Sequence, residues 1–164
     1  MSLVVRPAVF ADAEQIARLH VETWRQTYAH LLPTDFFGPA HARMRQDMWT
    51  RVLRDPHDEW TVRVVEADDS LVGFATSGPA ASSDGDDPPR ARQLFSLYVD
   101  VSRHGAGIGR ALLDAVLGDD AALLWVAKQN PRAIAFYMRN GFTFDGEERA
   151  DPGTPSIEEA RMVR

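Results

Sequence analysis

The order of apolar and polar residues in the first part of the chain predicts a strand followed by a helix. Residues 3–6 form a short apolar run that is typical of a strand. Largely apolar positions then recur at helical spacing, at Ile16, Leu19, Thr23, Trp24 and Thr27. Asp12 stands at the N-cap position of this predicted helix, which we expect to end at residues 31–33.

A second helix and a hairpin are predicted next. The helical stretch covers residues 34–54 and is interrupted by a Gly-Pro pair. Its apolar face is expected to carry Met44, Met48, Trp49 and Val52. Residues 60–66 and 71–77 alternate with the period of a strand across a short Asp-Asp-Ser turn, which predicts a hairpin. Residues 78–89 are rich in Gly, Pro, Ser and Asp, so we expect an exposed loop there.

Strands and helices alternate through the rest of the chain. The predicted segments are strand 94–99, helix 110–117, strand 123–127, helix 131–140 and two closing strands at 142–144 and 157–163. Gly141 is well suited to end the last helix as a left-handed cap. This order predicts a mixed α/β layer fold, and the length suits one domain over residues 1–164.

Composition narrows the chemistry. The chain has no cysteine, which excludes disulfides, thiolate metal sites and an acyl group carried on an enzyme cysteine. Its five histidines show no spacing typical of metal ligands, so we expect no metal.

Charge and hydropathy indicate the partners and the cellular location of the protein. The formal net charge is −6 and no basic stripe is present, which argues against nucleic acid and suits a cationic or amine-bearing substrate. The longest apolar run, residues 121–127, is far shorter than the roughly 20 residues of a membrane helix. Arg6, Pro7 and Asp12 make the start unlike a secretory leader, so we expect a cytoplasmic protein with no membrane partner.

The turn between the predicted strand and helix of the second half contains three alternating glycines, Gly105, Gly107 and Gly109. Glycines leave backbone amides uncovered, and amides at a helix N-terminus point outward with a partial positive charge. An anion such as a phosphate therefore fits this turn. Arg103 and Arg110 flank it and would complement the charge.

Other phosphate-binding patterns do not match the turn. A dinucleotide fingerprint needs a third glycine where this chain has Arg110 or Leu112. The Gly-Lys-Ser/Thr tripeptide of the phosphate-binding loop of nucleoside triphosphatases is absent from the sequence. A tight turn that requires positive φ at several glycines, without any ligand, remains the alternative.

A second motif follows in residues 130–142, with Asn130, Ala133, Phe136, Tyr137, Gly141 and Phe142 at its fixed positions. Asn130 as a cap and Pro131 in the first turn also make sense for the helix alone. Ala133, Phe136 and Tyr137 share one helical face, so a packing role is possible for each. A tyrosine phenol can also hydrogen-bond or protonate a leaving thiolate.

Both motifs resemble the GNAT superfamily of N-acetyltransferases. Its members carry Gln/Arg-x-x-Gly-x-Gly/Ala at the turn, where this chain has residues 104–109 with His104 at the first position. They carry Asn-x-x-Ala-x-x-Phe-Tyr-x-x-x-Gly-Phe at the second motif, which this chain matches at every fixed position. The resemblance is specific over residues 94–142 and architectural elsewhere.

The resemblance implies a fold, a donor and a chemistry. The fold is a central mixed, mostly antiparallel sheet of about seven strands, splayed between strands four and five and flanked by about four helices. Acetyl-CoA would be the co-substrate, with its pyrophosphate on the turn and its pantetheine arm beside the central strand. The residues so assigned to acetyl-CoA are Leu97, Tyr98, Val99, Arg103, His104, Gly105, Ala106, Gly107, Ile108, Gly109, Arg110, Asn130, Ala133, Phe136 and Tyr137.

The implied reaction is direct transfer of the acetyl group to a primary amine in a ternary complex. Tyr137 would protonate the leaving thiolate, and the Val99 N–H would contact the developing oxyanion. The acceptor is open between a small-molecule amine and a protein or peptide amine, and a homodimer is an expectation from the family. The base is left unassigned, with Glu22 and Asp100 as candidates and Gln93 near the place where many relatives have Glu.

The acceptor pocket and the competing functions are less defined by the sequence. Trp24 and Tyr28 lie at i and i+4 and are expected either to line the acceptor pocket or to pack in the core. A non-catalytic acyl-CoA sensor would keep the turn and tolerate loss of Tyr137. A nucleotide-binding module would need an acidic residue on strand 123–127, which has none. Acyl donors longer than acetyl stay open.

Overall fold

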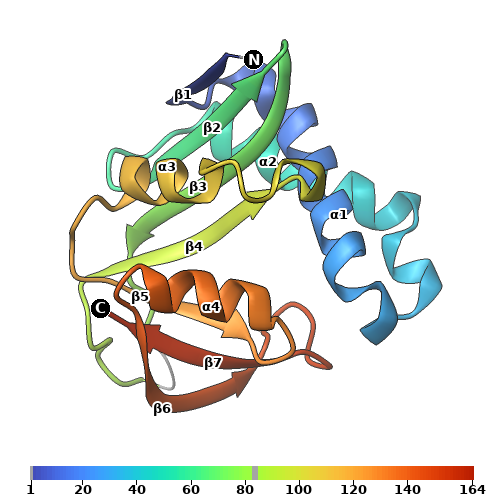
Figure 1. Ribbon diagram of the computed structural model, residues 1–164. Coiled ribbons are helices and arrows are strands. Elements are labelled where there is room, and N and C mark those ends of the chain that lie inside the picture. The colour runs from blue at the N-terminus through green and yellow to red at the C-terminus, as the bar shows by residue number, and fades with distance from the viewer. Residues whose placement is uncertain (1, 83–84) are drawn as a thin grey trace.

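One sheet organises the molecule, which a computed structural model describes over residues 2–82 and 85–164 (Figure 1). In this described part, seven strands follow the order β1-β2-β3-β4-β5-β7-β6. Their bounds are β1 Leu3–Pro7, β2 Thr61–Ala67, β3 Ser70–Pro79, β4 Arg92–Val99, β5 Leu123–Ala127, β6 Thr143–Ala150 and β7 Glu158–Val163. Among these seven described strands only β4 and β5 pair in parallel, which confirms the predicted mixed, mostly antiparallel sheet.

Helices cover both faces of the sheet. The longer ones are α1 Ala13–Tyr28, α2 Pro39–Arg54, α3 Ile108–Val116 and α4 Pro131–Arg139. Neighbouring residues of a strand point to opposite faces, so Val65 packs with α3 while Val64 packs with α1 and α2. Figure 1 shows α3 and α4 crossing in front of the sheet. No helix of residues 2–82 and 85–164 is long and apolar enough to cross a membrane.

The sheet opens between β4 and β5. Their parallel register covers only two pairs, Gln93 with Leu123 and Leu94 with Leu124. Beyond Leu94, β4 follows β3 while β5 follows β7, so the two strands diverge (Figure 1). The predicted splay between strands four and five is therefore confirmed, and it leaves the C-terminal half of β4 without a partner on one edge.

Two expectations about the first two helices need correction. Asp12 does not cap α1 with its side chain: its carboxylate accepts the Val9 N–H at 2.8 Å and pairs with Arg6 at 2.8 Å. The Asp12 carboxylate thus binds Arg6 of β1 instead of the backbone N–H groups in the first turn of α1. On α2, Trp49 is buried but Met44 is 53% exposed and Val52 39% exposed. The buried stripe of α2 runs through Trp49 and its neighbours toward α1, because α2 packs mainly on that helix.

β6 is longer than the predicted strand at residues 142–144. Its sequence from Asp145 to Arg149 is polar, and most of its side chains are exposed. An edge strand has backbone partners on one side only and need not bury either face, so hydrophobic alternation does not mark it. The predicted loop at residues 78–89 begins within β3, which continues to Pro79, and residues 83–84 of it lie outside the described residues.

Candidate active site

The glycine-rich turn connects β4 to α3 by way of a short 3-10 turn, Val101–Arg103. Gly105 and Gly107 have φ of +83° and +79°, and a Cβ at either position would meet nothing within 4 Å. Their role is conformational, since an L side chain is strained there. Gly109 has another role: a Cβ there would lie 3.2 Å from the ring of Phe136, so glycine lets α3 and α4 approach closely.

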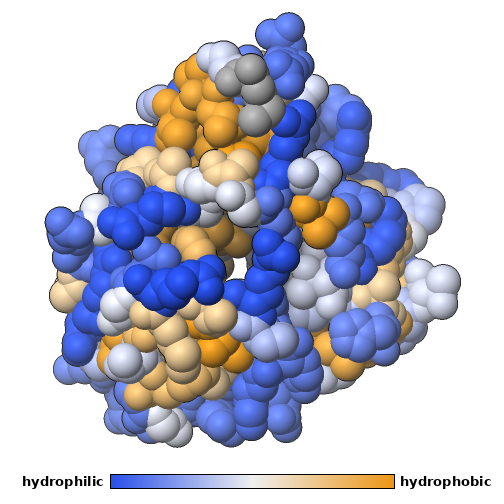
Figure 2. All heavy atoms as spheres, in the orientation of Figure 1, coloured by the Kyte–Doolittle hydropathy of each residue, from blue (hydrophilic) through white to orange (hydrophobic). Residues whose placement is uncertain are grey.

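A cavity of about 730 Å³ lies on this turn, between α3, α4 and the open edge of β4. Every residue expected to bind acetyl-CoA lines it except Ala106. Figure 2 shows the molecule hollowed in the middle of this face, with hydrophilic residues around the opening. The volume is within the range of about 300–1,000 Å³ that is usual for small-molecule and cofactor sites. We call this space the donor cavity.

The donor cavity is electropositive. Four arginines line it, Arg103, Arg110, Arg132 and Arg139, and none of its lining residues in the described part of the chain is acidic. Arg110 is held by Asp114 at 2.9 Å and by the side-chain oxygen of Asn140 at 3.0 Å. This charge, together with the amides at the start of α3, suits a ligand that carries several phosphates, although the whole chain is acidic.

The open edge of β4 presents backbone groups to the donor cavity. The Asp100 N–H donates to the Val72 carbonyl at 2.9 Å, and antiparallel pairs alternate between bonded and non-bonded. By that alternation, the backbone N–H and C=O of Val99 and Leu97 face away from β3, toward the gap left by β5. The Val99 carbonyl accepts a hydrogen bond there from Nε2 of His104 at 3.0 Å. An extended ligand chain would find strand-like partners along this edge.

Asn130 and Tyr137 bring the second motif to the same place. The Asn130 side chain accepts the Ala133 N–H at 3.2 Å, which caps α4 as predicted, and it donates to the Tyr28 hydroxyl at 3.4 Å. Tyr137 is 8% exposed and its ring packs on Phe142. Burial raises the pKa of the Tyr137 phenol above its ordinary value, so the phenol keeps its proton at neutral pH.

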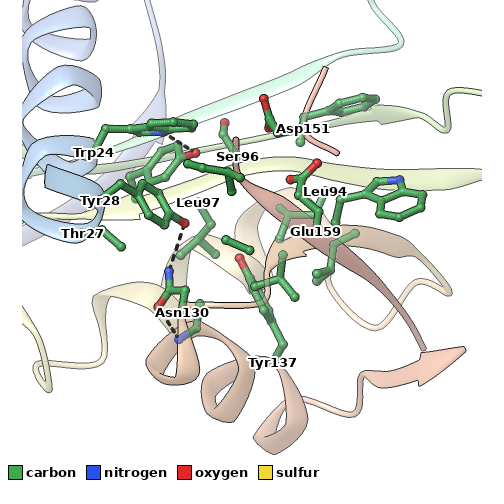
Figure 3. Close-up of a pocket in the computed structure, with 18 of the residues that line it drawn as sticks. Trp24, Thr27, Tyr28, Leu94, Ser96, Leu97, Asn130, Tyr137, Asp151 and Glu159 are labelled. Atoms are coloured by element: carbon green, nitrogen blue, oxygen red, sulfur yellow. Dashed lines mark hydrogen bonds between the residues drawn. The ribbon is translucent and has the colours of Figure 1, made fainter. Parts of the chain in front are cut away.

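A smaller cavity of about 210 Å³ adjoins the first on the side of α1 and β7 (Figure 3). Both cavities are lined by Thr27, Leu97, Tyr98, Asn130, Ala133 and Tyr137, so Tyr137 stands where they meet. Trp24 and Tyr28 line the smaller cavity, and both are also buried in a core cluster with Ile157. The two roles considered for this pair are therefore compatible. We call this space the acceptor cavity.

Two carboxylates of the acceptor cavity were not found by sequence reasoning. Glu159 on β7 is buried and accepts a hydrogen bond from Nε of Arg149 at 3.0 Å. Asp151, after β6, accepts the N–H groups of Gly153 at 2.9 Å and Thr154 at 2.7 Å. Burial raises the pKa of Glu159, nearby Asp151 raises it further, and Arg149 opposes both. In sequence these residues are two of many acidic residues, and only the pairing of β7 with β5 brings them here.

The candidate bases named from the sequence lie elsewhere. Glu22 is half-buried and ion-paired with Arg25, and Asp100 accepts hydrogen bonds from the Ser102 amide and hydroxyl. Neither is among the lining residues of the donor or acceptor cavity. The bonds from Ser102 hold the pKa of Asp100 below its usual range, which weakens it as a base. Gln93 lines the acceptor cavity, where its side-chain oxygen accepts the Ala81 N–H at 3.0 Å.

Comparison with known proteins identifies the family of the chain. Residues 14–142 match the model of the Acetyltransferase (GNAT) family. The chain is 34% identical to the uncharacterized N-acetyltransferase YuaI of Bacillus subtilis (strain 168), covering 83% of this chain and 78% of that protein. It is 27% identical to the probable N-acetyltransferase Rv2775 of Mycobacterium tuberculosis, covering 87% of this chain and 80% of that protein. The chain therefore belongs to the GNAT family of acetyltransferases.

Solved structures show the same fold. The crystal structure of the PaiA N-acetyltransferase from Thermoplasma acidophilum in complex with coenzyme A matches with a TM-score of 0.73 and 20% identity, covering 98% of each chain. The match establishes the fold of the present chain.

Proposed function

We propose that residues 1–164 form one N-acetyltransferase domain that moves an acetyl group from acetyl-CoA to a primary amine in a ternary complex. The observation that carries the proposal is the meeting of two cavities at Tyr137. One cavity is lined by arginines and by the glycine-rich turn at the start of α3, and the other contains carboxylates and aromatic rings. Such a pair suits an anionic donor on one side and a cationic acceptor on the other.

In this proposal, the turn amides from Gly105 to Gly109 hold the pyrophosphate of acetyl-CoA, with Arg103 and Arg110 beside it. The pantetheine arm lies along the open edge of β4 and hydrogen-bonds to the backbone of Leu97 and Val99. The His104 ring nitrogen that hydrogen-bonds to the Val99 carbonyl lies at the same edge. When the pantetheine arm binds there, the His104 ring either contacts the arm or moves aside and frees the Val99 carbonyl for it.

The transfer itself needs a donor for the oxyanion and an acid for the thiolate. The amine nitrogen attacks the thioester carbon, and the Val99 N–H, which faces the gap, stabilises the oxyanion that develops. The C–S bond then breaks and the Tyr137 phenol protonates the sulfur. The raised pKa of Tyr137 supports this role, because the phenol must still hold its proton when the thiolate leaves.

A non-catalytic acyl-CoA sensor is the second candidate. It would use the donor cavity alone and would have no need of the acceptor cavity that opens beside Tyr137.

The acceptor is either a small-molecule amine or an amine of a protein or peptide, because the acceptor cavity encloses only a short group.

The first test is thermal unfolding of the purified protein with acetyl-CoA, and with NAD and ATP as controls. A ligand that binds the folded state only raises the midpoint, by about 2.7 kcal/mol of stabilisation at 100 times its Kd. We expect a shift with acetyl-CoA that the controls do not match, followed by thiol release when amines are added. No shift at millimolar acetyl-CoA would contradict the donor site, and a shift without thiol release from any amine would favour the sensor.

A further inference from the structure

The acceptor cavity has charged side chains in its wall. Its charged lining residues are Arg149, Asp151 and Glu159, which is two carboxylates against one guanidinium. Aromatic rings, including those of Trp24 and Tyr28, form much of the remaining wall. A net negative charge beside aromatic faces favours an ammonium group. The acceptor cavity, at about 210 Å³, is much smaller than the donor cavity of about 730 Å³, so it suits a short aminoalkyl end of the acceptor.

We infer that Glu159 is the base that takes the proton from the ammonium group of the acceptor. This assignment rests on the proposed function, since it concerns the acceptor half of the same reaction. Glu159 pairs in register with Ala127 at the end of β5, just where the sheet has opened. Figure 3 shows its carboxylate and the hydroxyl of Tyr137 pointing into the same space.

The surroundings of Glu159 hold it in place and leave it one oxygen for the acceptor. Within the described residues its hydrogen bonds go to Oε1 alone, from Nε of Arg149. Arg149 itself lies over the ring of Trp125 at 4.1 Å, which restricts its movement. Ala160 and Met162, which point to the opposite face of β7, are both buried, and Met162 packs in the core beside α3. The β7 backbone under the carboxylate is therefore held by buried side chains on its other face and by its pairing with β5.

The electrostatic environment suits a base. The charged and titratable groups around Glu159 are Arg149 on β6, Asp151 after β6, Tyr28 on α1, Tyr98 on β4 and Tyr137 on α4. Burial and Asp151 raise the pKa of Glu159, which brings it closer to that of an ammonium group and makes the carboxylate a stronger base. Arg149 limits this rise, because its positive charge favours the carboxylate form.

The proton balance of the reaction is complete with these groups. Glu159 removes one proton from the ammonium nitrogen, and the neutral amine then forms the C–N bond to the thioester carbon. Tyr137 gives its proton to the sulfur as the C–S bond breaks, and the nitrogen returns its second proton to Tyr137. Glu159 releases the first proton to water, so the transfer yields an amide, a thiol and one proton.

The test compares Glu159→Gln with Glu158→Gln. Gln keeps an oxygen that can accept from Arg149 but cannot take a proton, and Glu158 is an exposed residue of β7 that pairs with Lys128. The acceptors are spermidine and a lysine-containing peptide, which are ammonium ions at pH 7, and methoxyamine, which is neutral at that pH. Thiol release is measured from pH 6 to pH 10, and thermal shift by acetyl-CoA reports the donor site separately.

We expect Glu159→Gln to lower kcat/KM for an ammonium acceptor by about 100-fold at pH 7, within the usual range of general-base effects. The deficit shrinks as the pH rises, because solution then supplies neutral amine, and it is small for methoxyamine at every pH. Acetyl-CoA stabilises both variants as it does the wild type, and Glu158→Gln turns over normally.

Two results would overturn the assignment alone: wild-type turnover by Glu159→Gln, or an equal deficit with methoxyamine, which indicates a structural role. If the wild type is stabilised by acetyl-CoA but acetylates none of these amines, the proposed function fails and the assignment fails with it. The thermal shift and the wild-type turnover therefore distinguish the two failures.

Discussion

At the scale of single residues, the phenol of Tyr137 has the most direct role in the proposed reaction. Its ring packs against Phe136 and Phe142, and its hydroxyl lies where the donor and acceptor cavities meet. Tyr137→Phe keeps the ring and removes only the acid. We expect kcat to fall by about 100-fold, with acetyl-CoA affinity within twofold of wild type and little change in stability. Steady-state thiol release and acetyl-CoA titration measure the two effects.

Tyr28→Phe is a useful companion to that variant. It removes the hydroxyl that accepts from Asn130, while leaving Tyr137 intact. If Tyr137→Phe turns over at the wild-type rate, the thiolate leaves without help from this phenol. A loss of acetyl-CoA affinity that matches the loss of kcat would instead mean that the hydroxyl binds the donor.

At the scale of elements, the turn before α3 requires glycine for its backbone shape. Gly107 is the N-cap of α3 with φ +79°, and Gly118, past the end of the same helix, has φ +56°. Gly107→Ala and Gly118→Ala should each cost about 1–2 kcal/mol of stability, because both force an L residue into the left-handed region. Only Gly107→Ala should also weaken acetyl-CoA binding, by about tenfold or more, because it moves the amides that face the donor cavity.

Urea unfolding measures the stability cost of these two variants, and calorimetric titration measures their acetyl-CoA affinity. Equal affinities in the two variants would show that the turn tolerates distortion, and the phosphate-binding role of its amides would have to be given up. Gly118 is a suitable control, since a Cβ there comes no closer than 3.9 Å to another group, the Asp114 carbonyl.

The elements also explain how far the sequence leads. The turn and α4 are each local in sequence, so Gly107, Asn130 and Tyr137 are recognisable from spacing, and the helix order follows from periodicity. Glu159 is different: it joins the acceptor cavity through the register of β7 on β5, more than 30 residues away in the chain. The sequence predicts only the first part of β6, because a polar edge strand has no buried face and therefore shows no alternation of apolar and polar residues.

At the scale of the whole molecule, His20 connects the helical layer of α1 and α2 to the sheet. Its ring stacks on Tyr98 of β4 at 5.1 Å, and its Nδ1 accepts from the Trp49 indole of α2 at 3.2 Å. Burial lowers the pKa of His20 to about 3, and Arg45 and His41 lower it further in the same direction. The folded protein therefore holds this ring neutral at a position that all three elements share.

The stability of the molecule should consequently depend on pH through His20. The unfolded chain binds a proton on this ring below pH 6.5 and the folded protein does not until about pH 3, so the free energy of unfolding falls as the pH falls between these values. From pH 7 to pH 5 the loss from this residue is about 2 kcal/mol. His20→Asn keeps an acceptor for Trp49 without a titrating ring, so its urea-unfolding free energy should decline less over that interval. His57→Asn, at an exposed histidine, is the control, and its free energy of unfolding should change with pH as that of the wild type does. If the free energies of all three proteins fall in parallel with pH, His20 is protonated in the folded protein at little cost.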